Sequence, residues 1–351
     1  MPGAAGVDRA DGSHTARGRA AAERHAPDLL PSPSSSVTSR LLTPLTAALA
    51  GVALACATGT PAPPAGTTSD TQAGASLAAA DSAGFRFTGD FAGPLGVQLY
   101  SVRGAMRGDV PGTLARVRAL GFREVELAGT YGMSAPQFRQ ALDQAGLRAT
   151  SMHVGYERLR DSLPAVLAEA QVLGARYVGT AWIPHPNGPL TVARAREAAA
   201  DFDRWGKAAR AQGRQLFYHI HGYEFQPAPD GVVPMDVLMR DTDPDAVKFE
   251  MDVFWAALPG ADPVALLRRY PGRWKLMHLK DMKRGVATNV HTGGANPDST
   301  EVPVGTGQID YRAVLRAARE VGVERYFIED ETVAPFATIP ASTRWLERVR
   351  Y

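Results

Sequence analysis

The sequence predicts an α/β protein whose longest part forms a single (β/α)8 barrel, the TIM-barrel architecture. Three observations support this fold class. One pattern recurs six times between residues 115 and 329. In it, an expected helix ends in Gly, and within a few residues a run rich in Val, Tyr, Phe, Ile and Leu follows. Eight strand–helix units fit within roughly 265 residues, the usual size of such a barrel. Reactive side chains also collect where the expected strands end.

The repeated pattern has a local physical cause. Glycine after the last helical turn adopts the left-handed conformation without steric cost, and β-branched and aromatic runs suit buried strands. An open doubly wound sheet, the main alternative, would usually carry a Gly-rich phosphate loop after its first strand, and Tyr100–Arg103 is not such a loop. The expected strands are 95–103, 122–129, 147–155, 175–185, 214–225, 246–255, 273–281 and 325–331. The expected helices are 109–120, 134–145, 162–173, 190–212, 233–240, 262–269, 308–321 and 335–349.

Residues 1–56 are interpreted as a leader with a lipoprotein signal. Residues 41–55 are apolar and uncharged, and they have the length of a signal-peptide core rather than of a membrane span. Val52–Cys56 resembles a bacterial lipoprotein cleavage box, which predicts lipidation of Cys56 and an exported, membrane-anchored protein. The alternative is a disordered Ala-rich leader with a chance cysteine. The upstream segment is too long for a usual signal, so we expect translation to begin later, for example at Val37.

Composition separates the rest of the chain into a linker and a barrel domain. Residues 57–84 are rich in Gly, Pro, Ala and Thr, which predicts a flexible tether, and residues 85–351 form the expected catalytic barrel. A single cysteine excludes a disulfide framework and a Cys-rich metal site. Because 38 Lys and Arg face 36 Asp and Glu, the net charge of +2 argues against a nucleic-acid partner.

Chemistry in such a barrel occurs at the carboxyl ends of the strands. Six of the eight histidines lie at or near these ends and none lies in an expected helix, namely His153, His185, His219, His221, His278 and His291. Imidazoles and carboxylates that converge on one mouth bind divalent metals or move protons. The other polar or aromatic side chains expected there are Gln98, Tyr100, Arg103, Glu126, Thr180, Trp182, Glu224, Asp252, Lys280, Asp281, Glu329, Asp330 and Glu331.

Six segments resemble one superfamily in its own order. They are LGVQLYSVR, YHIHGYEF, FEMDVFWAALPGADPVALLRRYPGR, LMHLKDM, VPVGTGQIDYRAVL and YFIEDE. Over residues 95–351 the chain resembles the sugar phosphate isomerase/epimerase superfamily, the xylose-isomerase-like TIM barrels that also include endonuclease IV. The resemblance implies four metal ligands at the ends of the last four strands: His219, Asp252, His278 and Glu329.

The fifth strand departs from the family pattern. Many members end it with Glu-Asn-His, whereas this chain has His219, Ile220 and His221. Glu224 is therefore the alternative to His219 as the fourth ligand. Asp252 could instead cap a helix. A set of two histidines and two carboxylates suits Mn²⁺, Co²⁺, Zn²⁺ or Fe²⁺ better than Ca²⁺.

The family chemistry implies a metal that polarises a sugar carbonyl while a base removes the α-proton to give an enediolate. The candidate acid–base groups are Glu329, His153, Lys280 and Glu126. The candidate substrate contacts are His221, Trp182, Tyr100 and Glu331. For Trp182, Phe254 and Trp255 plain packing is the alternative, and for Glu126 a structural ion pair. The long segment 283–306 is expected to be a lid loop, and Val302–Gly307 resembles a family turn that could equally be structural.

We therefore expect a metal-dependent sugar isomerase or epimerase acting through an enediolate. Expected export, and the lack of an evident Arg/Lys cluster or Gly-rich phosphate cradle, favour an unphosphorylated keto or aldo sugar as substrate. A metal-dependent lyase or dehydratase on a keto-sugar or glycoside is the second hypothesis, supported by His219, and a non-catalytic sugar-binding lipoprotein is the third. We expect membrane contact only through a lipid anchor, while assembly into a homo-oligomer stays open.

Overall fold

The computed structural model describes residues 84–186, 189–294 and 299–351. The predicted leader, the signal segment with Cys56 and the linker up to residue 83 lie outside the described residues. Within the described ranges, no helix is both long and apolar enough to cross a membrane.

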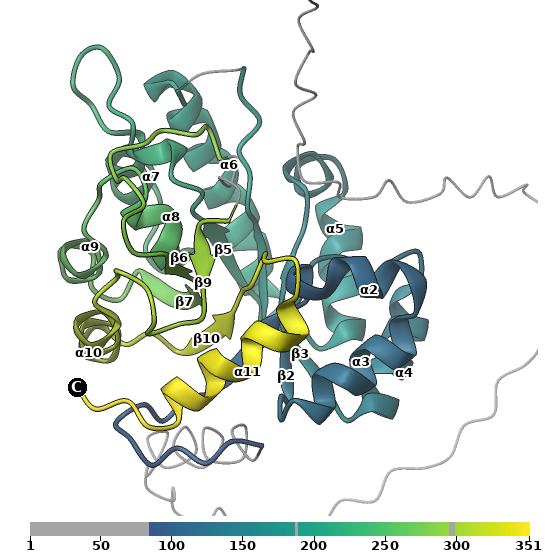
Figure 1. The fold of residues 1–351 in the computed structure, drawn as a ribbon. Coiled ribbons are helices and arrows are strands. Elements are labelled where there is room, and N and C mark those ends of the chain that lie inside the picture. The colour runs from purple at the N-terminus through teal and green to yellow at the C-terminus, as the bar shows by residue number, and fades with distance from the viewer. Residues whose placement is uncertain (1–83, 187–188, 295–298) are drawn as a thin grey trace, which may run out of the picture.

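Eight parallel strands close into a barrel with the order β1-β10-β7-β6-β5-β4-β3-β2, and helices surround it (Figure 1). This confirms the predicted TIM barrel. The strands are β1 (Leu95–Gln98), β2 (Glu124–Leu127), β3 (Arg148–His153), β4 (Tyr177–Thr180), β5 (Gln215–His219), β6 (Val247–Asp252), β7 (Trp274–Leu279) and β10 (Arg325–Ile328). A separate antiparallel pair, β8 (Asp281–Met282) and β9 (Glu301–Val302), lies in the long connection after β7.

Each predicted helix is present, with shifted ends. They are α3 (Val110–Ala119), α4 (Ala135–Ala145), α5 (Tyr156–Leu173), α6 (Val192–Ala211), α7 (Pro234–Asp241), α9 (Pro263–Arg269), α10 (Tyr311–Val321) and α11 (Pro335–Leu346). α5 begins earlier than expected because a helical turn precedes a kink at Ser162, just before Pro164. The predicted C-cap glycines hold: Gly146, Gly174 and Gly322 close α4, α5 and α10 in the left-handed conformation.

Two strands are shorter than predicted because a side chain starts a helix at their ends. The Gln98 side chain accepts the Tyr100 N–H and begins η1 (Leu99–Val102), which leads into α2 (Arg103–Gly108). Tyr100 therefore lies on a helical turn, not on the first strand. Likewise Asp252 accepts the Trp255 N–H and begins α8 (Val253–Ala257), so the sixth strand ends at Asp252.

An apolar cluster lies in the barrel interior below the polar site, beside the ion pairs of the buried Glu124 with Arg148 and Arg325. Tyr177, Phe217, Leu276 and Phe327 form a buried cluster. A Cβ atom on Gly179 would lie 2.6 Å from the Phe217 ring, so this glycine makes room for the aromatic filling. Two residues further along β5, β7 and β10, the inward side chains become His219, His278 and Glu329. The polar site therefore rests on an apolar floor.

The two ends of the described domain lie together. The Thr88 N–H donates to the Glu347 carbonyl at 2.7 Å, and the Asp90 N–H donates to the Val349 carbonyl at 2.8 Å. The Tyr351 N–H donates to the Asp90 carboxylate at 2.6 Å. Because residues 86–94 lead directly into the start of β1, this junction lies at the amino ends of the barrel strands, opposite the expected mouth.

Candidate metal centre

The ends of β6 and β7 and the residue after β10 bring Asp252, His278 and Glu329 together. Their possible ligand atoms lie within 4.8 Å of one another. His278 Nδ1 is 3.8 Å from Asp252 Oδ2 and 3.3 Å from Glu329 Oε2. His219 Nε2, from the end of β5, lies 4.0 Å from the same Asp252 oxygen. The residues predicted as metal ligands therefore face one another. We define these four residues as the candidate metal centre.

The two oxygens of Asp252 have different surroundings. Oδ1 accepts the Trp255 N–H at 3.0 Å and caps α8. Oδ2 is buried and has no hydrogen-bond partner, and burial raises the pKa of Asp252 to about 6. An unpaired buried carboxylate oxygen is costly unless something compensates it. With two imidazoles and a second carboxylate beside it, this oxygen fits a divalent cation. Asp252 can therefore cap α8 through Oδ1 and still offer Oδ2 as a ligand.

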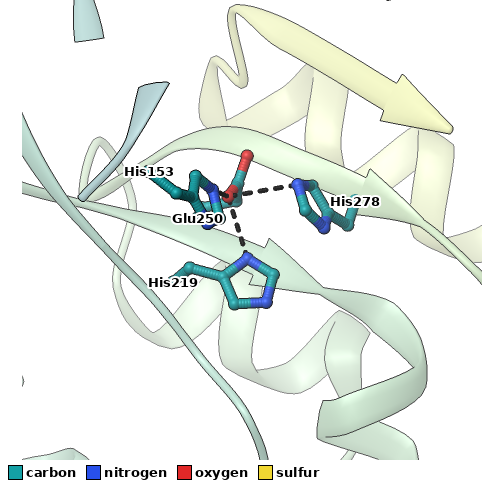
Figure 2. A group of neighbouring side chains, drawn as sticks. All are labelled: His153, His219, Glu250 and His278. Atoms are coloured by element: carbon teal, nitrogen blue, oxygen red, sulfur yellow. Dashed lines mark hydrogen bonds and ion pairs between the residues drawn. The ribbon is translucent and has the colours of Figure 1, made fainter. Parts of the chain in front are cut away.

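A second group lies one layer deeper and centres on Glu250, which we had not predicted (Figure 2). Glu250 Oε2 is 2.8 Å from His219 Nδ1, 3.1 Å from His153 Nε2 and 3.3 Å from His278 Nε2. Alternation along β6 could have found it, because Glu250 is two residues before Asp252 and so shares its inward face.

Glu126, from β2, completes the deep group. Its Oε1 lies 2.5 Å from His278 Nε2 and 3.1 Å from His153 Nε2, and it accepts a hydrogen bond from the Gln98 amide at 2.8 Å. Burial alone would raise the pKa of Glu126, but His153 and His278 lower it to about 2. Glu126 is therefore an anion held beneath the metal centre, and its predicted role as an acid–base group stays a prediction.

The histidines differ sharply in charge. Burial, together with the neighbouring imidazoles, holds the pKa of His219 well below its usual value, so this ring is neutral. Burial would also lower the pKa of His278, but Glu250, Glu329 and Glu126 hold it well above the usual value. For His153, Glu126 and Glu250 overcome burial and raise the pKa to about 9.

Lys280 is the central cation above the predicted ligands. Its Nζ is 2.7 Å from Glu329 Oε2, 2.6 Å from Glu331 Oε1 and 3.8 Å from Asp252 Oδ2. Burial would lower the pKa of Lys280, but these carboxylates and Glu301 hold it well above its usual value. The side chain is almost fully buried, so Lys280 is not a surface lysine.

Glu301, on β9, is a further acidic group that the sequence did not single out. Its Oε1 is 3.8 Å from Lys280 Nζ, and its Oε2 accepts the Glu331 N–H at 2.8 Å. Burial raises the pKa of Glu301 to about 7. The predicted lid segment thus contributes a carboxyl group to the site through the β8–β9 pair, which only the folded chain brings near β7.

Two of the predicted substrate contacts lie beside this centre: the His221 ring is 4.7 Å from the His219 ring, and Glu331 pairs with Lys280. The Trp182 ring packs on His185 and Tyr223, with centroids 5.1 and 4.7 Å apart, and the His221 ring is 6.3 Å away. His221 is half-buried and its Nδ1 has no hydrogen-bond partner. Phe254 and Trp255 are buried in an apolar cluster. Lys280 Nζ nevertheless lies 5.9 and 5.6 Å from their ring centroids, so packing and substrate contact both stay open for these two.

Glu224 and Tyr100 lie apart from the ligand atoms. The buried Glu224 carboxylate accepts hydrogen bonds from the Tyr218 hydroxyl and, at 3.1 and 3.2 Å, from the His221 N–H. It therefore supports the turn after β5, and the described ligand groups contain His219 instead. Tyr100 is half-buried on η1, with the Arg103 guanidinium 4.0 Å above its ring.

A surface groove beside the mouth contains three arginines. It has a volume of about 550 Å³, and Arg103, Arg107 and Arg116 are among its lining residues, with Thr332–Ala337 along its other side. Arg103 also lies 3.7 Å from Glu331. The three arginines lie within residues 103–116, and the fold places Thr332–Ala337 opposite them. The expectation of an unphosphorylated substrate stays a prediction.

Residues 114–349 match the family model described as a xylose isomerase-like TIM barrel. The chain belongs to this family. An inosose dehydratase from Lacticaseibacillus casei is 32% identical over 149 residues, which cover 40% of this chain and 48% of that protein. The chain thus matches about half the length of this relative.

Solved structures share the fold of this xylose isomerase-like protein. A sugar phosphate isomerase/epimerase from Parabacteroides distasonis ATCC 8503 has a TM-score of 0.59 and 24% identity, covering 72% of this chain and 93% of that one. The IolI protein with a bound zinc atom has a TM-score of 0.54 and 13% identity, covering 72% and 94%. The comparisons thus show the xylose isomerase-like TIM-barrel family and fold, and the described residues place a buried His/Asp/Glu cluster in this barrel.

Proposed function

We propose that this protein is a metal-dependent dehydratase that eliminates water from an unphosphorylated keto-sugar or ring-shaped keto-polyol. The observation that carries this proposal is the asymmetry of the candidate metal centre. A symmetric epimerase scheme needs carboxylate bases on both faces of the substrate, whereas here β5 supplies the neutral His219 and only Glu329 remains in such a position. The name of the Lacticaseibacillus casei relative, inosose dehydratase, supports the same reaction class.

His219 Nε2, Asp252 Oδ2, His278 Nδ1 and Glu329 Oε2 would hold the cation. Such a cation would polarise the substrate carbonyl and stabilise the charge of the enediolate. The donor set suits Mn²⁺, Co²⁺, Zn²⁺ or Fe²⁺. Lys280 Nζ, anchored between Glu329 and Glu331, would donate a hydrogen bond to a substrate oxygen at the mouth.

Elimination needs one group that takes the α-proton and another that protonates the leaving hydroxyl. Glu301 suits the first task, because its pKa of about 7, raised by burial, makes it an effective base near neutral pH. His153 suits the second, because Glu126 and Glu250 overcome burial and raise its pKa to about 9. Nε2 shares its proton with those two carboxylates, so the Nδ1 proton is the one available for transfer.

Product analysis in D₂O tests this proposal. Metal-loaded protein is incubated with a panel of unphosphorylated keto-sugars and keto-polyols, and products are followed by NMR and mass spectrometry. We expect a product that has lost one water and whose formation is abolished by a chelator and restored by metal. A phosphorylated analogue of each active substrate serves as the comparison, because the arginine groove offers a place for an anionic substituent. No turnover of any compound by a protein that binds no metal would contradict the proposal.

Isomerisation or epimerisation is the second candidate function. It is supported by the contact between Glu329 and Lys280 at 2.7 Å, which would let one proton be held near the enediolate and returned to carbon. The same experiment separates the two reactions, because this alternative conserves the substrate mass and exchanges one carbon-bound proton for deuterium. A non-catalytic sugar-binding role would give saturable sugar binding without either change.

We also propose that the protein acts outside the cytoplasm, anchored through Cys56. The apolar segment 41–55 followed directly by cysteine supports this location. Labelling of cells with a fatty-acid analogue tests it: label should enter the wild-type protein and be absent from Cys56→Ala. Equal labelling of both, or recovery of both in the soluble cytoplasmic fraction, would contradict the anchor.

A further inference from the structure

The Glu250 carboxylate, beneath the candidate metal centre, contacts three imidazoles. Glu250 Oε2 lies within 3.3 Å of ring nitrogens of His153, His219 and His278 (Figure 2). Glu250 is fully buried on β6, and its register partner on β5 is His219. Its neighbours Phe249 and Met251 belong to the large apolar core, whereas Glu250 shares the inward face of Asp252.

These contacts decide which nitrogen of His219 faces the mouth. An ionised Glu250 carboxylate only accepts hydrogen bonds, so its 2.8 Å contact with His219 then places the imidazole proton on Nδ1. The other nitrogen, Nε2, then carries a free lone pair, and it is the one directed towards Asp252 Oδ2. The ring orientation and the tautomer are both fixed by Glu250.

The same carboxylate layer orients His278. Its Nε2 is turned towards Glu126 at 2.5 Å and Glu250 at 3.3 Å. Nδ1 is therefore the nitrogen that faces Asp252 and Glu329. Both imidazoles thus present a ligand nitrogen on the upper side while a buried carboxylate holds the lower side, which is how metal-binding histidines are commonly oriented.

We propose that Glu250 is the positioning residue that makes His219 a metal ligand, and that His219 and Glu250 form a matched pair. The inference rests on the proposed metal centre. A carboxylate at position 219 would lie against the carboxylate of Glu250 in a buried space, where two like charges repel strongly. Many family members carry a negative charge at the end of the fifth strand. Here the negative charge is on Glu250, one layer deeper on β6, and the neutral His219 ring would lie between it and the cation.

The pairing predicts a specific double-variant result. In His219→Glu the new carboxylate meets Glu250, so the divalent-metal affinity should fall by more than 100-fold. In the double variant His219→Glu/Glu250→Gln the buried repulsion is removed, so affinity should recover by at least 10-fold over His219→Glu. Glu250→Gln alone should weaken metal binding by about 10- to 100-fold, the usual effect of losing a carboxylate that orients a metal-bound histidine.

The readouts are metal affinity and histidine tautomer, both measured without substrate. Zn²⁺, Mn²⁺ and Co²⁺ affinities are determined by calorimetry on the purified protein, and the ring nitrogens of His219 are assigned by ¹⁵N NMR in chelator-treated protein. Wild-type His219 should be protonated on Nδ1 alone, and Glu250→Gln should give a mixture of tautomers. Glu224→Gln is the matched control, because this buried glutamate also lies in the β5–β6 region but contacts no ligand imidazole.

The inference is overturned if Glu250→Gln keeps both the wild-type affinity and the Nδ1–H tautomer, or if the double variant binds metal no better than His219→Glu. Should His219→Glu fail to fold, the Glu250→Gln affinity and tautomer still decide the matter. A wild-type protein that binds metal in a Glu250-dependent way but turns over no sugar would refute the proposed function alone. A wild-type protein that binds no metal would overturn both.

Discussion

Asp252→Asn separates the two roles of one side chain. Asparagine is about as good an N-cap as aspartate, so its Oδ1 keeps the hydrogen bond from the Trp255 N–H, which measures 3.0 Å in the wild-type protein. Its amide nitrogen, however, replaces Oδ2, the buried oxygen with no hydrogen-bond partner. An amide N–H cannot ligate a cation. We therefore expect the metal-free variant to be as stable as the wild type and to have lost metal binding selectively.

The size of the effect follows from mass action. At a free metal concentration of 100 Kd, binding stabilises the folded protein by about 2.7 kcal/mol, which corresponds to a rise in Tm of roughly 5–10 °C for a domain of this size. If the variant binds about 100-fold more weakly, the same concentration gives only about 0.4 kcal/mol and a rise of roughly 1 °C.

Thermal unfolding with and without metal measures this difference. Asp310→Asn is the matched control, because Asp310 caps α10 through the Ala313 N–H at 3.1 Å and lies away from the metal centre. The control should keep the full metal-dependent rise. A metal-dependent rise of wild-type size in Asp252→Asn would refute the assignment of Oδ2 as a ligand, and an unfolded metal-free variant would refute the claim that the cap survives.

Other substitutions test the support around the site. Asp281→Asn should lower the free energy of unfolding by about 2–4 kcal/mol. Oδ2 accepts the Gly305 and Gly307 N–H groups, both at 2.9 Å, and an amide nitrogen cannot accept them. Denaturant unfolding measures the loss, and an unchanged midpoint would contradict the prediction. In the same assay, Gly179→Ala should lower the free energy of unfolding by about 1–3 kcal/mol or more, because the new Cβ would lie 2.4 Å from the Phe217 carbonyl oxygen. Gly104→Ala, which adds a Cβ in open space, should not destabilise the protein. Lys280→Met should reduce kcat by about 10²–10⁴-fold without weakening metal binding. Steady-state kinetics measure this reduction, and a wild-type kcat would show that Lys280 takes no part in the reaction.

The barrel could be predicted because its signals are local. The pattern that recurs six times, a Gly after a helix and a β-rich run after that Gly, is encoded within about fifteen residues, as in the segment that ends α4 at Gly146 and continues into β3. The candidate ligands Asp252, His278 and Glu329 could be identified for the same reason, since each lies at or just after the end of a strand and strand ends meet at one face of a barrel.

What the sequence did not reveal depends on contacts between distant segments. Glu250 alternates with apolar residues on β6, and its importance becomes visible only when β3, β5 and β7 place three imidazoles around it. Glu301 reaches the site through the antiparallel pairing of β8 with β9. The sequence of this segment has no periodicity that predicts the pairing. The early end of β1 depends on a single side-chain cap by Gln98.

The junction between residues 86–90 and the last residues of the chain has a practical consequence. Both termini of the barrel leave from the closed end, held by the Thr88 and Asp90 backbone contacts. A purification tag, a fluorescent fusion or a surface attachment joined to residue 84 or to Tyr351 would therefore lie at the amino ends of the strands and leave the mouth unobstructed. Protein immobilised through either of these two points should still admit solutes at the mouth.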